Sequence, residues 1–401
     1  MSPIRRLLRA ALFVFALNAP VAALAQSEAE VAQWNRAVTL MQAGDVAAAL
    51  PLLERLVSEA PGKAVYRLEL AAALFRQGRY GRARYHADLA ALGDLAPEAR
   101  LAARRIASTA ADRQPLTGYF QLNILPETNP GRQTSQSSVD INGIEFGLNE
   151  DARAEASTSV IVVAGGTYMH PLGDRLRLRF GADLWARHNP DERLQDRQLT
   201  LRAGPFWQGA DGSRFGIDVT RGRNWNAGVP VDETRGLRLE AGRPLGQRSY
   251  LAFAAARTWA SATDGTGDEV DDRLVLGLSH MQSDTLLLRG NLSVLRKEAR
   301  FATQDYTERG LSVGAQKFWS GGWTVQGDLS VARRSYGGRD PLFGIARQDD
   351  RLRLDLSVMD RDLRIGPFVP ELRLGLERAR SSIDMRSYDN RALQISFTRR
   401  F

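Results

Sequence analysis

The chain has 401 residues, no cysteine and a formal net charge of +8, and 25% of its residues are charged. This length allows two domains or one large one, and the missing cysteines exclude disulfide staples and paired-cysteine motifs. The basic charge is spread along the chain, and such a charge on its own suggests nucleic-acid binding. The export signal described next argues against that and favours a basic pore or an acidic client.

The first 25 residues have the composition of a secretory signal peptide. Three arginines precede an apolar stretch over residues 10–17, and Ala23 and Ala25 frame a small-x-small cleavage site. Cleavage at this site predicts a mature chain that begins at Gln26. An exported chain without cysteine indicates the envelope of a Gram-negative cell.

Residues 26–112 have a helical period and an internal repeat. An offset of 34 residues places Gly44 on Gly78 and Ala49 on Ala83. Glycine supplies the left-handed turn between paired helices, and alanine lets the helices approach closely. The pattern resembles tetratricopeptide repeats, so we expect a small helical domain with a concave surface for another protein. The alternative is a plain helical spacer.

After the helical region, apolar and polar residues alternate. Leu176 and Leu178, for example, share one face of a predicted strand, and Arg177 and Arg179 share the other. Fourteen such segments begin near Leu116, Ala156, Arg175, Arg193, Arg214, Thr234, Ser249, Asp271, Thr285, Thr307, Trp323, Asp349, Phe368 and Asn390. Single-chain bacterial outer-membrane barrels have an even number of strands. We therefore predict an all-β transmembrane barrel of 14 antiparallel strands over residues 115–401, preceded by the small all-α domain.

The links between the predicted strands alternate in length. Links after segments two, four, six, eight and ten are short turns, such as 173–174 and 246–248, and longer polar links follow odd-numbered segments, such as the one near Asp264. Outer-membrane barrels have short turns on one side of the membrane and long loops on the other. The alternation therefore favours a barrel over a soluble sandwich.

Tryptophans mark both predicted membrane interfaces, on the parity of the apolar face. Those beside short turns are Trp207, Trp319 and Trp323, and those toward the long links are Trp225 and Trp259. The same parity places Arg221, Arg223 and Arg257 on the lipid-facing side, where a charge at mid-depth costs roughly 2–4 kcal/mol. Either these arginines lie near the outer headgroups, or a bulge shifts the register.

The polar face of the predicted strands is rich in arginine. The lumen-facing candidates are Arg177, Arg179, Arg202, Arg238, Arg273, Arg289, Arg353 and Arg373. Such a set could make a lumen that attracts anions. The alternative is a wall network in which carboxylates neutralise the arginines, and the candidate carboxylates are Asp183, Glu240, Asp328, Asp355 and Glu377.

No catalytic, cofactor-binding or metal-binding residue is predicted. The four histidines lack metal-ligand or triad-like spacing, and the sequence has no phosphate-cradling glycine loop. One enzymatic alternative stays open: a lipolytic barrel in which His280 pairs with a serine or aspartate across strands.

The chain keeps a strand pattern to its last residue. Leu393, Ile395, Phe397 and Phe401 share the lipid-facing parity. We expect this last strand to pair with the first one and to close the barrel without an edge in lipid. An alternating last strand that ends in phenylalanine also resembles the signal by which outer-membrane barrels are handed to the insertion machinery.

Deletion of Phe401 is therefore expected to reduce the amount of assembled barrel by more than the stability of one residue explains. Immunoblots of outer-membrane fractions measure this effect. Normal membrane levels of the truncated chain would contradict the expectation.

Three segments together resemble the surface lipoprotein assembly modulator family. The first strand runs into ILPETNP, residues 124–130, with its Pro-x-x-Asn link. INGIEFGLNEDARAE, residues 141–155, resembles the first-loop segment of the family, and residues 366–401 resemble its closing hairpin. The N-terminal domain holds only about two repeats and is shorter than in many relatives.

The resemblance implies a non-enzymatic outer-membrane translocator that moves dedicated client proteins or lipoproteins to the cell surface. Its helical domain would lie in the periplasm and engage the client or its chaperone, and the barrel would provide the route. The implied partners are the client, periplasmic chaperones, the barrel insertion machinery and the lipid bilayer, with no cofactor and no nucleic acid. A diffusion porin for anionic solutes is the alternative from another class.

Overall fold

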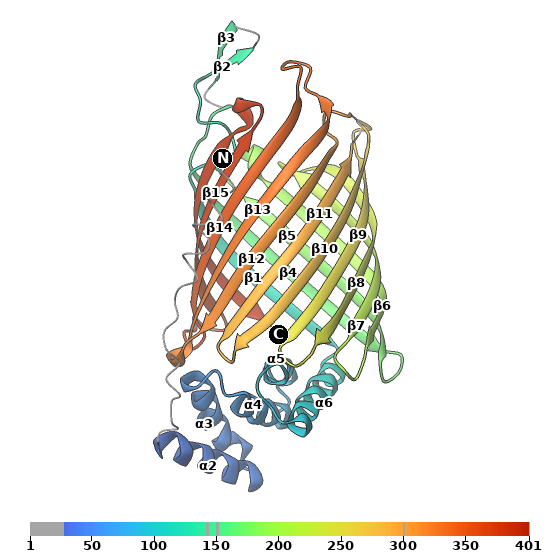
Figure 1. The fold of residues 1–401 in the computed structure, drawn as a ribbon. Helices are drawn as coiled ribbons and strands as arrows, with labels where there is room; N and C mark the ends of the chain where they lie inside the picture. Colours follow the sequence, from blue (N-terminus) through green and yellow to red (C-terminus); the bar gives the residue numbers. More distant parts are fainter. Residues whose placement is uncertain (1–27, 142–143, 150–151, 300, 401) are drawn as a thin grey trace.

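The computed structural model describes residues 28–141, 144–149, 152–299 and 301–400 (Figure 1). The predicted signal cleavage site and the last residue lie outside these ranges: Ala23, Ala25, Gln26 and Phe401. Within the described ranges, no helix combines the length and the apolar character needed to cross a membrane.

The helical domain consists of five helices in the described part of the chain. They are α2 (Glu28–Gln42), α3 (Val46–Glu59), α4 (Ala64–Arg76), α5 (Tyr80–Leu92) and α6 (Pro97–Arg113). Gly44 and Gly78 both have positive φ, 81° and 73°, at the corners between paired helices. Ala49 and Ala83 are fully buried where the helices touch. The 34-residue offset therefore predicted both the turns and the close helix contacts.

Fourteen antiparallel strands of the described chain close into a barrel, which confirms the predicted fold class. The barrel strands are β1 (Leu116–Glu127), β4 (Ser157–Pro171), β5 (Leu176–His188), β6 (Asp196–Gln208), β7 (Arg214–Asn226), β8 (Val229–Leu245), β9 (Ser249–Ala262), β10 (Asp268–Ser283), β11 (Leu286–Glu298), β12 (Tyr306–Phe318), β13 (Trp323–Arg339), β14 (Ala346–Asp360), β15 (Val369–Ser381) and β16 (Tyr388–Arg400). Each strand pairs with its neighbour, and β16 pairs with β1 as predicted. A separate hairpin of β2 (Ser138–Ile141) and β3 (Ile144–Gly147) extends from the first long loop (Figure 1).

Figure 1 shows the helical domain beneath one end of the barrel, where the short turns lie. We call this the short-turn end and the opposite end the long-loop end. The predicted alternation of link lengths fails at two places. The β14–β15 link, at the short-turn end, spans residues 361–368 and is longer than several links at the long-loop end. The β7–β8 link, at the long-loop end, has only Ala227 and Gly228. Both residues have positive φ, 48° and 81°, as in a type I′ hairpin turn. Strand β8 starts at Val229, so residues expected in a loop extend the hairpin instead.

The arginines on the apolar parity point outward near the long-loop end. The side chain of Arg221 is 79% exposed and lies 3.5 Å from Glu233, which also pairs with Arg223 at 3.3 Å. Arg257 donates two hydrogen bonds of 2.6 Å to Asp272. The register shift in β7 falls after Asn224, beyond Arg221 and Arg223, and leaves both of them outward. This favours the headgroup explanation over the bulge.

The helical domain contacts four of the short turns. Ser58 donates a 2.5 Å hydrogen bond to Asp362 in the β14–β15 link, and Arg67 lies over the Phe318 ring beside the β12–β13 turn at 6.0 Å. The link between α3 and α4 meets the β10–β11 turn near Gly62, and Arg104 of α6 lies close to the β6–β7 turn. These turns belong to strands β15 through β6 in the barrel order, so the domain lies across the short-turn mouth.

His86 of α5 lies at this contact and makes the domain sensitive to acid. Burial, reinforced by the charges of Arg67, Arg82 and Arg361, lowers the pKa of His86 from 6.5 to about 3. Its Nδ1 is buried and has no hydrogen-bond partner among the described residues. An unfolded chain therefore takes up a proton at His86 below pH 6.5, whereas the folded domain does not until about pH 3.

The contribution of His86 to the stability of the helical domain is accordingly expected to be full above pH 6.5 and to fall as the pH drops toward 3. The loss from this group is up to about 1.4 kcal/mol per pH unit within that window. Thermal melts of the full chain in detergent, followed by the helical signal at 222 nm, measure it. A His86→Gln variant should flatten the dependence, and an equal pH dependence in both proteins would contradict the assignment.

Candidate functional site

The seam between β1 and β16, where the first and last strands meet, is interrupted near the long-loop end. Their ladder pairs Ile124 with Ile395 and Glu127 with Ala392 but skips Leu125 and Pro126. Proline has no N–H to donate, so a ladder weakens where it occurs. By contrast, β1 pairs with β4 without interruption along its whole length. The ladder between β1 and β16, where the barrel closes, is therefore less regular than the ladder between β1 and β4.

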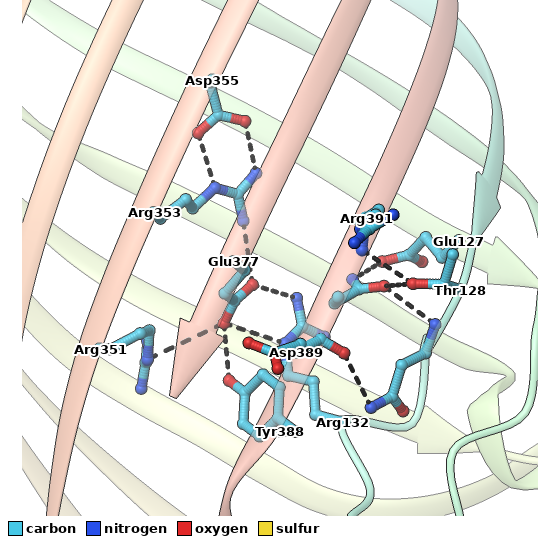
Figure 2. Close-up of polar contacts among 12 residues, drawn as sticks. Glu127, Thr128, Arg132, Arg351, Arg353, Asp355, Glu377, Tyr388, Asp389 and Arg391 are labelled. Atoms are coloured by element: carbon cyan, nitrogen blue, oxygen red, sulfur yellow. Dashed lines mark hydrogen bonds and ion pairs between the residues drawn. The ribbon is translucent and has the colours of Figure 1, made fainter. Parts of the chain in front are cut away.

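Side chains on the inner wall beside the seam surround Glu377 of β15 (Figure 2). Tyr388 donates a 2.6 Å hydrogen bond to Glu377 Oε1, and Arg132 Nη2 lies 3.2 Å from Oε2. Arg353 lies 3.6 Å from the same carboxylate, and Arg351 lies 3.9 Å from it. We call these five residues the Glu377 cluster. It joins the first long loop, through Arg132, to three strands on the other side of the seam.

An asparagine pair ties the start of the first loop across the seam. The backbone N–H of Asn129 donates to Asn390 Oδ1 at 3.0 Å, and Asn390 Nδ2 donates to Glu127 Oε1 at 2.8 Å. Asn129 is 2% exposed, and its own Oδ1 accepts from the N–H of Gln133 at 2.9 Å. These polar links offset the ladder bonds that the seam lacks. Sequence reasoning missed them, although Asn129 belongs to the ILPETNP segment.

The arginines predicted for the lumen make ion pairs with inward carboxylates. Arg202 pairs with Asp183, Arg289 with Asp328 at 3.2 Å, Arg353 with Asp355 at 2.6 Å, Arg373 with Glu371 at 2.9 Å, and Arg238 with Glu240 at 3.5 Å. Arg177 is buried, at 4% exposed, and Arg273 is exposed. Each of the five candidate carboxylates has at least one arginine partner, so these pairs offset much of the positive charge on the wall. A role for these arginines toward a solute or client stays a prediction.

The most buried of these pairs is centred on Arg179 of β5. Its Nε and Nη2 donate to the two carboxylate oxygens of Asp218 at 3.1 and 2.5 Å, and Nη1 donates to Glu240 at 2.6 Å. Asp218 is fully buried, and the Arg179 guanidinium lies over the Phe206 ring at 5.0 Å. Sequence reasoning missed Asp218, although it alternates with the outward Ile217 and Val219 and so had to face inward.

The structure brings together one serine–histidine pair that bears on the lipolytic alternative. Ser249 Oγ lies 2.9 Å from His280 Nδ1, across the β9–β10 pairing near the short-turn end. The described contacts of His280 include no carboxylate, so the third member of a triad is not present among them. The described residues also hold no group of three or more His, Cys, Asp or Glu suited to a metal ion.

Comparisons with known proteins identify both regions of the chain. Residues 203–401 match the sequence profile of the surface lipoprotein assembly modifier family, and residues 40–106 match that of a tetratricopeptide repeat. No curated protein matches the chain.

Among solved structures, the chain is similar to several outer-membrane barrels. A loop-deletion mutant of OmpT, an outer membrane protein of Vibrio cholerae, is 9% identical, with a TM-score of 0.38, over 71% of this chain and 99% of that one. A mutant of the TodX monoaromatic hydrocarbon channel is 13% identical, with a TM-score of 0.40, over 75% and 94%. A bacterial polysaccharide outer membrane secretin is 12% identical, with a TM-score of 0.38, over 70% and 98%.

At these scores the likenesses carry no argument about function. The family profile and the repeat profile do carry such an argument, because the first falls on the closed barrel and the second on the helical domain that precedes it. The C-terminal region of this chain therefore belongs to the surface lipoprotein assembly modifier family, and its N-terminal region is a tetratricopeptide repeat domain.

Proposed function

We propose that this chain moves dedicated lipid-anchored client proteins across the outer membrane and displays them on the cell surface. Family membership gives the coarser role, in surface lipoprotein assembly at the outer membrane. In the finer proposal, the helical domain faces the periplasm and engages the client or its chaperone. The barrel then provides the route, after the insertion machinery has placed it in the membrane.

One observation carries the proposal: the repeat domain is docked across the short-turn mouth of a family barrel. Repeat domains of this kind bind other proteins, and here the domain contacts the turns through Ser58, Gly62 and Arg67. A polypeptide bound by the domain is therefore held at an entrance to the barrel. A diffusion porin has no need of such a domain.

The lipolytic alternative rests on the Ser249–His280 pair at 2.9 Å. It predicts release of fatty acid from phospholipid vesicles by the purified chain and loss of that release in Ser249→Ala. The proposed function predicts no release by either protein. It also predicts unchanged client display in Ser249→Ala.

Protease shaving of intact cells tests the proposed function. Cells that express candidate client lipoproteins are compared with and without this chain, and a plasmid copy restores it. We expect at least one client to be cleaved only in cells that carry the chain, with a periplasmic marker protected in all samples. Unchanged surface exposure of every candidate client would overturn the proposal.

A further inference from the structure

An apolar groove lies on the outer face of the barrel beside the seam. Its volume is about 520 Å³, and it is lined by Leu354, Leu356, Leu374, Leu376, Leu393 and Pro126 among others. The leucines alternate with inward Arg353, Asp355 and Glu377, so they face away from the lumen. Leu374 and Leu376 are 52% and 50% exposed. The volume falls within the range of small-molecule binding sites, about 300–1,000 Å³.

A polar pocket of about 90 Å³ lies on the inner side of the same wall. Its lining includes Arg132, Arg353 and Glu377 of the Glu377 cluster. Gly375 and Ala392 are paired opposite each other and line both the outer groove and the inner pocket. Leu376 and Glu127 line both as well, so these four residues form the wall that separates the apolar side from the polar side here.

The rim of the groove toward the long-loop end carries arginine side chains, with Glu127 beside them in the lining. Arg391 lines the groove with an exposed side chain, and its backbone N–H donates to Thr128 Oγ1 at 2.9 Å. At the next outward-facing pair, Arg378 donates to Asp389 at 2.7 Å on the same outward face. A guanidinium can donate to the ester and amide carbonyls that join acyl chains to a lipidated residue. The groove thus offers an apolar trough with hydrogen-bond donors at one end.

We infer that this groove holds the acyl chain of a lipid-anchored client, an inference that rests on the proposed function. The occupant must match an apolar trough outside, donors at the rim and a polar charged pocket behind a thin wall. A lipidated polypeptide has parts for all three, whereas a bilayer phospholipid has no part for the inner pocket. The groove also lies where the β1–β16 ladder skips Leu125 and Pro126, which is the least costly place for the wall to part.

Photocrosslinking in nanodiscs tests the inference with the full chain. The probe is a synthetic dipalmitoyl peptide with a diazirine in one acyl chain, and a phosphatidylethanolamine with the same diazirine chain is the comparison lipid. In Leu374→Trp the indole fills the groove. Leu278→Trp is the matched control, because Leu278 is also outward and 46% exposed but belongs to β10, away from the seam.

We expect the lipopeptide to label β14–β16 at least several-fold more than the phospholipid does, and Leu374→Trp to remove that excess while Leu278→Trp keeps it. Equal labelling by both probes, or an excess that survives Leu374→Trp, would overturn the inference. Shaving of cells with Leu374→Trp separates it from the proposed function. If Leu374→Trp loses the lipopeptide labelling but still displays clients normally, the inferred role of the groove is overturned and the proposed function stands. If it also loses client display, the inferred role is supported. The proposed function itself fails only if the wild-type chain exposes no client.

Discussion

Replacement of Arg179 with alanine is expected to destabilise the barrel by roughly 3–5 kcal/mol, the cost of breaking a buried ion pair. Arg179 is 7% exposed, and its guanidinium bridges Asp218, which is fully buried, and Glu240. Removal of the arginine leaves the Asp218 carboxylate without the two hydrogen bonds that satisfy it. The contact with the Phe206 ring is lost as well.

Arg333→Ala provides the matched control for this prediction. Arg333 donates two hydrogen bonds to Asp350, at 2.6 and 2.9 Å, so the geometry is close to that of the Arg179–Asp218 pair. Both partners are about half exposed on the outer face, however. Exposed ion pairs contribute about 0–1 kcal/mol. Burial, and not the presence of an ion pair, should therefore decide the size of the loss.

Urea unfolding of the two variants in detergent micelles, followed by the gel mobility of folded and unfolded barrel, measures both losses. A second variant, Arg179→Lys, keeps the charge but cannot contact Asp218 with a planar fork. It should fall between the wild type and Arg179→Ala. Equal midpoints for Arg179→Ala and Arg333→Ala would show that the buried pair does not stabilise the barrel.

The barrel was predictable from the sequence because lipid imposes a strict period of two on each strand. Leu352, Leu354 and Leu356 face the membrane, and Arg353 and Asp355 between them pair on the inner side. The repeat glycines were predictable for a similar reason, since Gly44 needs positive φ whatever surrounds it. In both cases the structural requirement is local, so the identities of neighbouring residues in the sequence indicate it.

The partners across the barrel were not predictable, because they depend on the stagger between strands. Arg179 meets Asp218, which is 39 residues away, and Arg132 meets Glu377, which is 245 residues away. Alternation shows which side chains face inward but does not show which of them lie at the same height. Arg132 lies in a loop, where the residues follow no periodic pattern, so no local sequence feature indicated the Glu377 cluster.

The placement of the helical domain against the barrel was likewise not predictable from the sequence. Arg67 looks like a solvent-exposed charge on α4, yet it is 6% exposed and donates to the carbonyl of Pro61 at 3.1 Å. Burial lowers its pKa to about 10, which leaves it charged at neutral pH. Its contact with Phe318 exists only because the domain and the β12–β13 turn meet. A surface that is complementary to a second domain resembles any other polar helix face until both parts are placed.

Loosening this domain is expected to open the short-turn mouth to ions. A 14-stranded barrel is wider than the 8-stranded kind that side chains fill, and the helical domain crosses its mouth through contacts with four turns. Gly62 offers a way to move the domain. A Cβ at this position would lie 3.0 Å from the Cβ of Asp284 and 3.1 Å from Cγ2 of Thr285. In Gly62→Trp the indole cannot fit there, so the link between α3 and α4 must move away from the β10–β11 turn.

Single-channel recordings in planar bilayers measure the effect. Wild type should show low conductance, and Gly62→Trp should show a several-fold higher conductance. Gly173→Trp is the control, because Gly173 lies in the β4–β5 turn at the same end and a Cβ there meets no atom within 4 Å. It adds the same side chain without touching the docked helices and should conduct like wild type. If all three proteins conduct equally, the domain binds the rim without closing it, and client entry would need no movement of the helices.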